Sequence, residues 1–209
     1  MPSVYQLKPA FQGLLRPLVR WLAGAGVTAN QVTVAALLLS IATGAALALW
    51  PGERGPLLAL PIVLLVRMAL NAVDGMLARE HAQQSALGAV LNELGDVLAD
   101  SALYLPLALN PAFDSRLIVG IVLLSVVSEM TGIVGVQIGA SRRYDGPCGK
   151  SDRAFAFGLV SLLLSFGVPA GLWLTIVLGA LLLLLAITIL NRARGALREL
   201  RGQGVSDRP

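Results

Sequence analysis

Long apolar runs separated by short polar segments cover most of the chain. Each run is close to the roughly 20 residues that an α-helix needs to cross a bilayer. The runs lie at about 30–50, 56–79, 86–109, 116–139 and 154–190. The last run is too long for one helix, and Gly167, Pro169 and Gly171 divide it into two helices joined by a tight turn. The pattern predicts an all-α polytopic membrane protein with six transmembrane helices.

A different pattern precedes the first run. Apolar and polar residues there recur at helical spacing on two faces, with Val4, Leu7, Phe11, Leu14, Leu15, Leu18 and Leu22 on one and Lys8, Gln12, Arg16 and Arg20 on the other. This periodicity predicts an amphipathic helix in the cytoplasmic interface of the membrane. A helix packed on the protein itself is the alternative, and both can hold at once.

Local signals place the boundaries of the helical core. Thr28 and Gln31 have the spacing of a capping box, which predicts the start of the first span. We therefore interpret residues 1–209 as a single domain. It consists of an interfacial helix and its link (1–29), a six-helix core (30–190) and a basic cytoplasmic tail (191–209).

The composition excludes several classes of protein. The chain is 56% hydrophobic and 13% charged, with a mean hydropathy of +0.76. Soluble domains are roughly 25% charged, so a soluble enzyme and a disordered chain are both excluded. The single cysteine, Cys148, has no partner within the chain, which excludes a disulfide-rich secreted fold.

The charge distribution predicts an orientation in the membrane. The net charge is +4, which in so apolar a chain favours contact with an anionic leaflet over nucleic acid. With six spans, thirteen Lys and Arg residues fall on the side of the termini and two, Arg54 and Arg116, fall on the other. Both termini are therefore expected in the cytoplasm.

Charged and amide side chains interrupt the second and third spans. Arg67, Asn71 and Asp74 share one helix face, and Asn92, Asp96 and Asp100 share another. The short connection between the spans makes them antiparallel neighbours, so the two faces can meet near the cytoplasmic third of the bilayer. Their oxygen atoms suit a hard divalent cation such as Mg²⁺, Mn²⁺ or Ca²⁺. The alternative is a buried polar network that holds the helices together.

The spacing of these residues resembles a known signature. The residues in question are Asn71, Asp74, Gly75, Ala78, Arg79, Gly88, Asn92 and Asp96. Their order and gaps resemble the signature of the CDP-alcohol phosphotransferase family, D-x2-D-G-x2-A-R-x8-9-G-x3-D-x3-D, with Asn at two Asp positions. The family also has six membrane helices, an amphipathic N-terminal helix and a Thr-x-Asn-x-x-Thr segment, here Thr28, Asn30 and Thr33.

The resemblance implies a metal-dependent enzyme of phospholipid synthesis. In this family an alcohol attacks the lipid-bound phosphorus of a CDP-linked donor, usually CDP-diacylglycerol, and CMP leaves. By position, Asn71, Asp74, Asn92 and Asp96 are the metal ligands, and Asp96 is also the general base. The resemblance further implies a cytidine pocket lined by Gly75, Ala78 and Gly88, with Arg79 beside the diphosphate. Mg²⁺ is the expected cofactor, and Mn²⁺ or Ca²⁺ is also suitable.

Asn71 and Asn92 change the charge of the expected metal site. An amide oxygen can bind Mg²⁺ or Ca²⁺ but brings no negative charge. The site could therefore bind two metals more weakly, bind only one, or keep its lipid and nucleotide pocket without turnover. Because both changes preserve size and an oxygen atom, we favour an active variant enzyme.

A basic segment follows the fourth span. It contains Arg142, Arg143, Lys150 and Arg153. The resemblance implies that this segment holds the head group of the acceptor, and four cations would suit a phosphorylated or otherwise acidic acceptor. Ordinary positive-inside topology with contact to anionic lipid explains the cations equally well. For the arginines after Asn191 we favour this second interpretation.

Antiparallel register predicts one further contact, between Arg67 and Asp100. On two antiparallel helices, the residue numbers of any two residues at equal depth add up to the same value. The signature positions fix that value and place Arg67 level with Asp100. An unpaired charge at that depth is costly, so we predict a structural ion pair under the site, with Glu129 as a possible third member.

The sequence thus predicts an enzyme that transfers a phosphatidyl group from CDP-diacylglycerol to an alcohol in a bacterial inner membrane. The expected partners are these two substrates and membrane lipid, with no nucleic acid and a possible homodimer. Two other hypotheses remain, a non-catalytic lipid-binding or scaffold protein and an ion-coupled transporter. Release of CMP from CDP-diacylglycerol in the presence of different alcohols separates the three.

Overall fold

The computed structural model describes residues 4–202, with side chains described from residue 11 onwards, and its secondary structure there is entirely helical. The helices in order are α1 (Val4–Gly24), α2 (Ala29–Leu49), α3 (Arg54–Glu80), α4 (Ala86–Tyr104), the 3-10 helix η1 (Leu105–Leu109), α5 (Ser115–Gln137), α6 (Lys150–Ser165) and α7 (Leu172–Gly202). The all-α prediction is confirmed for this part of the chain.

Four of the described helices are long and apolar enough to cross a membrane: α2, α3, α5 and α7. Helix α6 has 16 residues, which is short for a span. Helix α4 carries Glu93, Asp96 and Asp100, which lower its hydropathy. The sequence predicted six spans, and length and composition support four of them.

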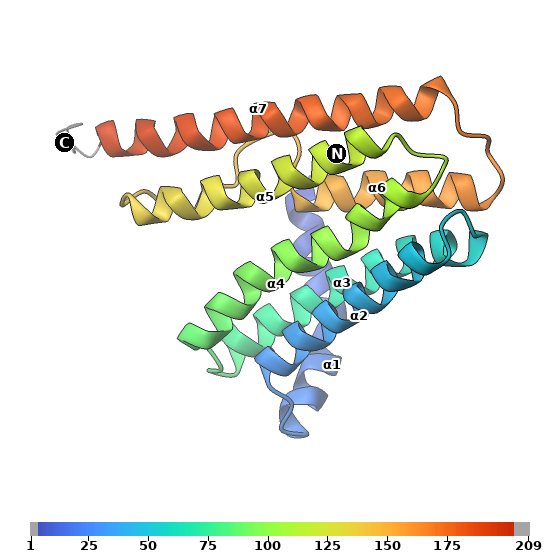
Figure 1. Ribbon diagram of the computed structural model, residues 1–209. Coiled ribbons are helices and arrows are strands. Elements are labelled where there is room, and N and C mark those ends of the chain that lie inside the picture. The colour runs from blue at the N-terminus through green and yellow to red at the C-terminus, as the bar shows by residue number, and fades with distance from the viewer. Residues whose placement is uncertain (1–3, 203–209) are drawn as a thin grey trace.

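The helices form two groups (Figure 1). Helix α2 packs against both α3 and α4, and α5 packs against α7. Helix α6 packs on α3 and so joins the two groups. Because successive helices alternate in direction, the α3–α4 turn and the long 138–149 loop both lie at the end of the bundle where the polar residues are found.

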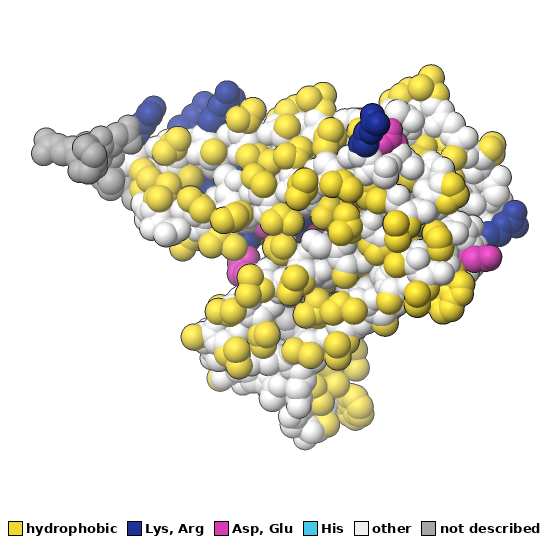
Figure 2. All heavy atoms as spheres, in the orientation of Figure 1, with side chains coloured by type: hydrophobic (Ala, Val, Ile, Leu, Met, Phe, Trp, Pro, Cys, Tyr) yellow, Lys and Arg dark blue, Asp and Glu magenta, His cyan; other side chains and the backbone are white. Residues whose placement is uncertain are grey.

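Apolar packing holds the opposite end of the bundle. Leu60, Leu103, Ile118 and Leu178 are fully buried in one core that draws on both groups of helices. Phe157 joins this core and stacks on Tyr104, with the ring centroids 4.4 Å apart. The outer faces of the helices carry many exposed apolar side chains, as expected for contact with lipid (Figure 2).

The capping box predicted before the first span is confirmed. The backbone N–H of Gln31 donates to Thr28 Oγ1 at 3.2 Å, and the backbone N–H of Thr28 donates to Gln31 Oε1 at 2.9 Å. Further along α2, glycine permits a close approach to α4, because a Cβ atom at Gly44 would lie 1.9 Å from the carbonyl oxygen of Ala102. The two helices are therefore in direct backbone contact.

Helix α1 packs against α3. Val19 is fully buried beside Met76 and Leu77, and Arg16 Nη2 lies 3.0 Å from Glu80 Oε1. The packed alternative from the sequence is thus confirmed. Another face of α1 exposes apolar side chains, Leu14, Leu18 and Trp21. This face fits the predicted position in the membrane interface.

Most helix ends agree with the predicted spans, although α6 begins at Lys150 and not near 154. The break within the last run is confirmed, since α6 ends at Ser165 and Gly167 follows with φ +87°. Helix α4 ends at Tyr104 instead of near 109, because Pro106 at the start of η1 has no N–H for an α-helical bond. Helix α7 continues to Gly202, so the first part of the predicted basic tail is helical, and residues 203–209 lie outside the described part.

Candidate active site

Arg67 and Asp100 form the ion pair that antiparallel register predicts. Arg67 Nη1 lies 2.5 Å from Asp100 Oδ1, and the side chains are 4% and 7% exposed. Arg153 of α6 approaches the other carboxylate oxygen, with Nη2 2.8 Å from Asp100 Oδ2. One buried carboxylate therefore joins α3, α4 and α6, and the two guanidinium groups compensate for its burial.

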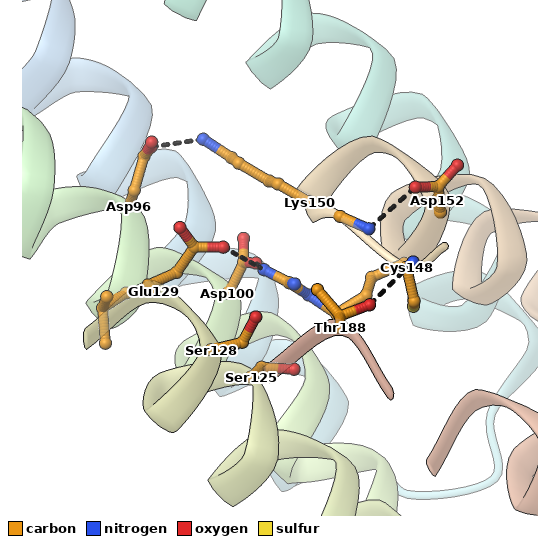
Figure 3. Close-up of polar contacts among 12 residues, drawn as sticks. Asp96, Asp100, Ser125, Ser128, Glu129, Cys148, Lys150, Asp152 and Thr188 are labelled. Carbon is orange, nitrogen blue, oxygen red and sulfur yellow. Dashed lines mark hydrogen bonds and ion pairs between the residues drawn. The ribbon is translucent and has the colours of Figure 1, made fainter. Parts of the chain in front are cut away.

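Asp96 lies one helical turn from Asp100, toward the N-terminal end of α4, and is more accessible. Its side chain is 32% exposed, and its Oδ1 atom contacts the ammonium group of Lys150 (Figure 3). Asn71 Nδ2 of α3 donates to the same oxygen at 3.4 Å, and Arg67 Nη2 lies 3.6 Å from it. Asp96 thus faces both its neighbours on α3 and the start of α6.

Asp74 is the more buried of the two signature carboxylates. Thr33 Oγ1 of α2 donates to Asp74 Oδ2 at 2.8 Å, so the Thr-x-Asn-x-x-Thr segment contacts the signature directly. Asn92, in contrast, is exposed and makes no described polar contact. The structure therefore brings Asn71, Asp74 and Asp96 to one site and leaves Asn92 at its edge.

Two glycines of the signature lie where side chains or polar atoms approach closely. A Cβ atom at Gly75 would lie 3.1 Å from Arg79 Nη2, so the exposed Arg79 side chain folds over the glycine. A Cβ atom at Gly88 would lie 2.8 Å from Asn30 Oδ1. Ala78 is half-buried on the same helix as Gly75. The missing side chains at the two glycines therefore make room for the Arg79 guanidinium group and the Asn30 amide oxygen.

The cations of the 138–149 loop are held by acidic partners. Arg142 Nη2 lies 2.8 Å from Glu93 Oε2 of α4. Arg143 Nη1 lies 2.9 Å from Glu199 Oε2 of α7, and its Nε lies 2.7 Å from Asp145 Oδ2. The hydrogen bond from Arg143 holds the pKa of Asp145 below its usual value. The loop is therefore tied to α4 on one side and to α7 on the other.

The four cations of the predicted basic segment, two in the loop and two in α6, do not gather in one place. Lys150 and Arg153 contact Asp96 and Asp100, respectively, while Arg143 points toward α7. Arg142 lies between them, beside α4. Of the four predicted acceptor-binding cations, the structure brings Lys150 and Arg153 to the two site carboxylates of α4.

Arg192 is a buried residue near the site that the sequence did not reveal. The prediction that the arginines after Asn191 only contact anionic lipid is wrong for Arg192. Its side chain is 3% exposed, Nη1 lies 3.3 Å from Glu129 Oε2, and the same nitrogen donates to the Ser128 carbonyl at 2.7 Å. The buried stripe of α7 contained the signal, because Arg192 continues the spacing of Leu181, Leu185 and Thr188.

A match to a known family covers most of the chain. Residues 26–191 match the family described as CDP-alcohol phosphatidyltransferase. The chain belongs to this family. Inner membrane protein YnbA of Escherichia coli (strain K12) is 46% identical over 195 residues, which are 93% of this chain and 96% of YnbA. Phosphatidylinositol phosphate synthase of Mycobacterium tuberculosis (strain ATCC 25618 / H37Rv) is 29% identical over 137 residues, which are 64% of this chain and 61% of that protein.

Solved structures of a mycobacterial protein share the fold. The crystal structure of Mycobacterium tuberculosis phosphatidylinositol phosphate synthase (PgsA1) in complex with manganese and citrate has a TM-score of 0.76 at 24% identity, over 92% of both chains. The structure of PgsA1 with CDP-DAG bound has a TM-score of 0.75 at 23% identity, over 92% of this chain and 96% of that one. This chain thus shares the helical fold of PgsA1. Its four long apolar helices and its similarity to an inner membrane protein indicate an integral membrane protein.

The donor atoms of the site fit a hard divalent cation. Asp74 and Asp96 supply carboxylate oxygens, and Asn71 and Asn92 can supply amide oxygens, which are the ligands that Mg²⁺ and Mn²⁺ prefer. The described part of the chain contains no cluster of three or more Asp, Glu, His or Cys side chains arranged for a metal. The four candidate ligands thus carry two carboxylates, from Asp74 and Asp96.

Proposed function

We propose that this protein transfers a phosphatidyl group from CDP-diacylglycerol to an alcohol and releases CMP. The alcohol oxygen forms a bond to the phosphorus attached to the lipid, the bond from that phosphorus to the oxygen of CMP breaks, and the hydroxyl proton leaves. Family membership and the fold shared with CDP-DAG-bound PgsA1 support this proposal. The positions and contacts of this chain's own signature residues support it independently.

The position of Asp96 is the observation that carries the proposal. A general base must lie where substrate can reach it, and Asp96 is the signature carboxylate with a 32% exposed side chain. The amide of Asn71 and the ammonium group of Lys150 fix its orientation. We assign Asp96 as the base that takes the proton of the alcohol.

The remaining signature residues bind the donor in this proposal. Gly75, Ala78 and Gly88 leave room for the cytidine, and Arg79 lies beside the diphosphate. Asn71, Asp74, Asn92 and Asp96 hold a divalent metal, with Mg²⁺ as our choice. When bound, this metal neutralises charge on the diphosphate during displacement. The binding of manganese by PgsA1 supports a divalent cation at this site.

A specific observation favours a second candidate, a lipid-binding protein without turnover. Lys150 and Arg67 both approach Asp96 Oδ1, so the oxygen that would accept the proton of the alcohol already has two cationic neighbours. Asn92 is exposed without a described polar contact. In this second candidate the fold and the donor pocket remain, and no alcohol is phosphatidylated.

Release of CMP decides between the two candidates. The full-length protein is placed in lipid nanodiscs with CDP-diacylglycerol, Mg²⁺ and a series of alcohols, and CMP is measured by chromatography. The enzyme proposal requires alcohol-dependent CMP release that the Asp96→Asn variant lacks. Binding of CDP-diacylglycerol without CMP release, for every alcohol, would establish the second candidate instead.

The orientation belongs to the same proposal. We place both termini and the 138–149 loop in the cytoplasm, because most Lys and Arg residues lie on that side of the membrane. A bacterial inner membrane is the proposed location, in agreement with the name of the E. coli relative, an inner membrane protein. The soluble acceptor and CMP then exchange with the cytoplasm, while the acyl chains of the donor stay in lipid.

A further inference from the structure

Three arginine side chains converge on the carboxylate of Glu129. Arg142 Nη2 of the loop lies 3.5 Å from Oε2, and Arg192 Nη1 of α7 lies 3.3 Å from the same oxygen. Arg153 Nη2 of α6 lies 3.4 Å from Oε1. One side chain of α5 is thus the shared partner of cations from three other segments, and Figure 3 shows it directed toward Asp100. We call Glu129 and these three arginines the Glu129 cluster.

The Glu129 cluster has hydrogen-bond donors that the described protein atoms do not use. The Nε atoms of Arg142, Arg153 and Arg192 are buried without a hydrogen-bond partner, as is Nη1 of Arg153. The Arg153 and Arg192 side chains are only 1% and 3% exposed. Buried guanidinium N–H groups are normally satisfied, so these donors are unused hydrogen-bonding capacity within the cluster.

The cluster adjoins the proposed site of transfer. Arg153 lies one turn after Lys150 on α6 and bonds to Asp100, which lies one turn after Asp96 on α4. Glu129 is 15% exposed and Arg142 is 19% exposed, so the cluster is accessible from one side. Figure 2 shows charged side chains in the hollow between the two groups of helices. An acceptor whose hydroxyl reaches Asp96 would place its remaining polar groups here.

Glu129 makes this cluster a poor site for a phosphoryl group. Convergent arginines bind phosphate well, because their N–H groups and charge match its oxygens. Here a carboxylate of the protein already takes that place, and a phosphate would stand beside a like charge. Cations in and beside the cluster also pair with other carboxylates, since Arg142 bonds to Glu93 and Lys150 contacts Asp96.

We infer that Glu129 determines acceptor specificity and that the acceptor is an uncharged alcohol with several hydroxyl groups. The unused guanidinium N–H groups donate to hydroxyl oxygens, and the carboxylate of Glu129 accepts from hydroxyl hydrogens. Such a mixture of donors and a carboxylate matches a polyol better than an anion. The inference rests on the proposed function. An uncharged acceptor differs from the acidic acceptor that the basic segment suggests in the sequence.

The Glu129→Gln variant tests this inference, because glutamine keeps the size and an oxygen of Glu129 but removes its charge. Binding of inorganic phosphate to the full-length protein in nanodiscs is measured by equilibrium dialysis with radiolabelled phosphate. We expect Glu129→Gln to bind phosphate at least tenfold more tightly than the wild type. Glu199→Gln is the matched control, since Glu199 pairs with Arg143 outside the cluster. It should leave phosphate binding unchanged.

Turnover gives a second readout. With CDP-diacylglycerol, the wild type should show a kcat/KM at least tenfold higher for glycerol or inositol than for glycerol 3-phosphate or inositol 1-phosphate. Glu129→Gln should reduce this ratio at least tenfold. Equal phosphate binding by wild type and Glu129→Gln, or a wild-type preference for the phosphorylated alcohols, overturns the inference.

Failure of the inference is distinguishable from failure of the proposed function. If no alcohol supports CMP release, the proposed enzymatic function fails, and the ratio of phosphate affinities still decides whether Glu129 excludes an anion. If Glu129→Gln does not fold, the wild-type preference between polyols and their phosphates decides the inference alone.

Discussion

Arg67 of α3 and Asp100 of α4 form a buried ion pair in which Nη1 lies 2.5 Å from Oδ1. Arg153 of α6 bonds to the second oxygen of the same carboxylate at 2.8 Å. Asp100 therefore connects three helices directly beneath the more exposed Asp96. This arrangement separates two functions of neighbouring carboxylates, since Asp100 is enclosed by protein and Asp96 is accessible to substrate.

Loss of the Asp100 charge should destabilise the protein. Asp100→Asn leaves Arg67 and Arg153 buried without a compensating charge, and breaking such a pair costs about 3–5 kcal/mol. Thermal unfolding in detergent, followed by circular dichroism, measures the change. Asp145→Asn is the control, because Asp145 forms a more exposed pair with Arg143 and should cost at most about 1 kcal/mol. Equal losses in the two variants would contradict a structural role for Asp100.

Replacement of the proposed base should remove turnover and spare donor binding. Asp96→Asn keeps the shape of the side chain but cannot accept the proton, so we expect CMP release to fall at least ~100-fold. Binding of CDP-diacylglycerol, measured by its protection against thermal unfolding, should change little. Asp114→Asn serves as the control, because Asp114 caps α5 at the other end of the bundle and asparagine caps equally well. Undiminished CMP release by Asp96→Asn would falsify the assignment.

Restoring carboxylates at the two asparagines should strengthen metal binding. The double variant Asn71→Asp and Asn92→Asp adds two negative charges to the site, so the Mg²⁺ concentration for half-maximal activity should fall. The single variants separate the two positions. Asn71 contacts Asp96 and Asn92 makes no described contact, so we expect the larger effect from Asn71→Asp. An unchanged metal dependence in all three variants shows that these side chains are not ligands.

The contact of α2 with α4 gives a prediction that is independent of function. A Cβ atom at Gly44 would lie 1.9 Å from the Ala102 carbonyl oxygen, so Gly44→Ala must push the helices apart. Overpacking of this kind costs about 1–3 kcal/mol, and the melting temperature should fall accordingly. Gly179→Ala on α7 has open space around it and should leave the melting temperature unchanged or raise it. Equal changes in melting temperature for the two variants would contradict the close contact between α2 and α4.

The sequence alone determined most of the helical framework. Apolar runs, the Thr28 capping box and the glycine at 167 are local signals, because each depends on residues within a few positions of one another. The Arg67–Asp100 contact was predictable for a related reason, since a short turn forces α3 and α4 to run antiparallel and so fixes which residues lie level. The sequence also predicted one site from Asn71, Asp74, Asn92 and Asp96, and in the structure Asn92 lies at the edge of that site.

Only the tertiary structure decided which cations meet which carboxylates. Lys150 contacts Asp96 from 54 positions away, and Arg192 reaches Glu129 from another helix. These contacts depend on how α6 and α7 rotate and pack against α3 and α5, which no short turn dictates. For the same reason the sequence could not show that Arg192 is buried or that Glu129 is the point where three arginines converge. Positive charge was visible in the chain, but its neutralisation depends on side chains that folding brings together.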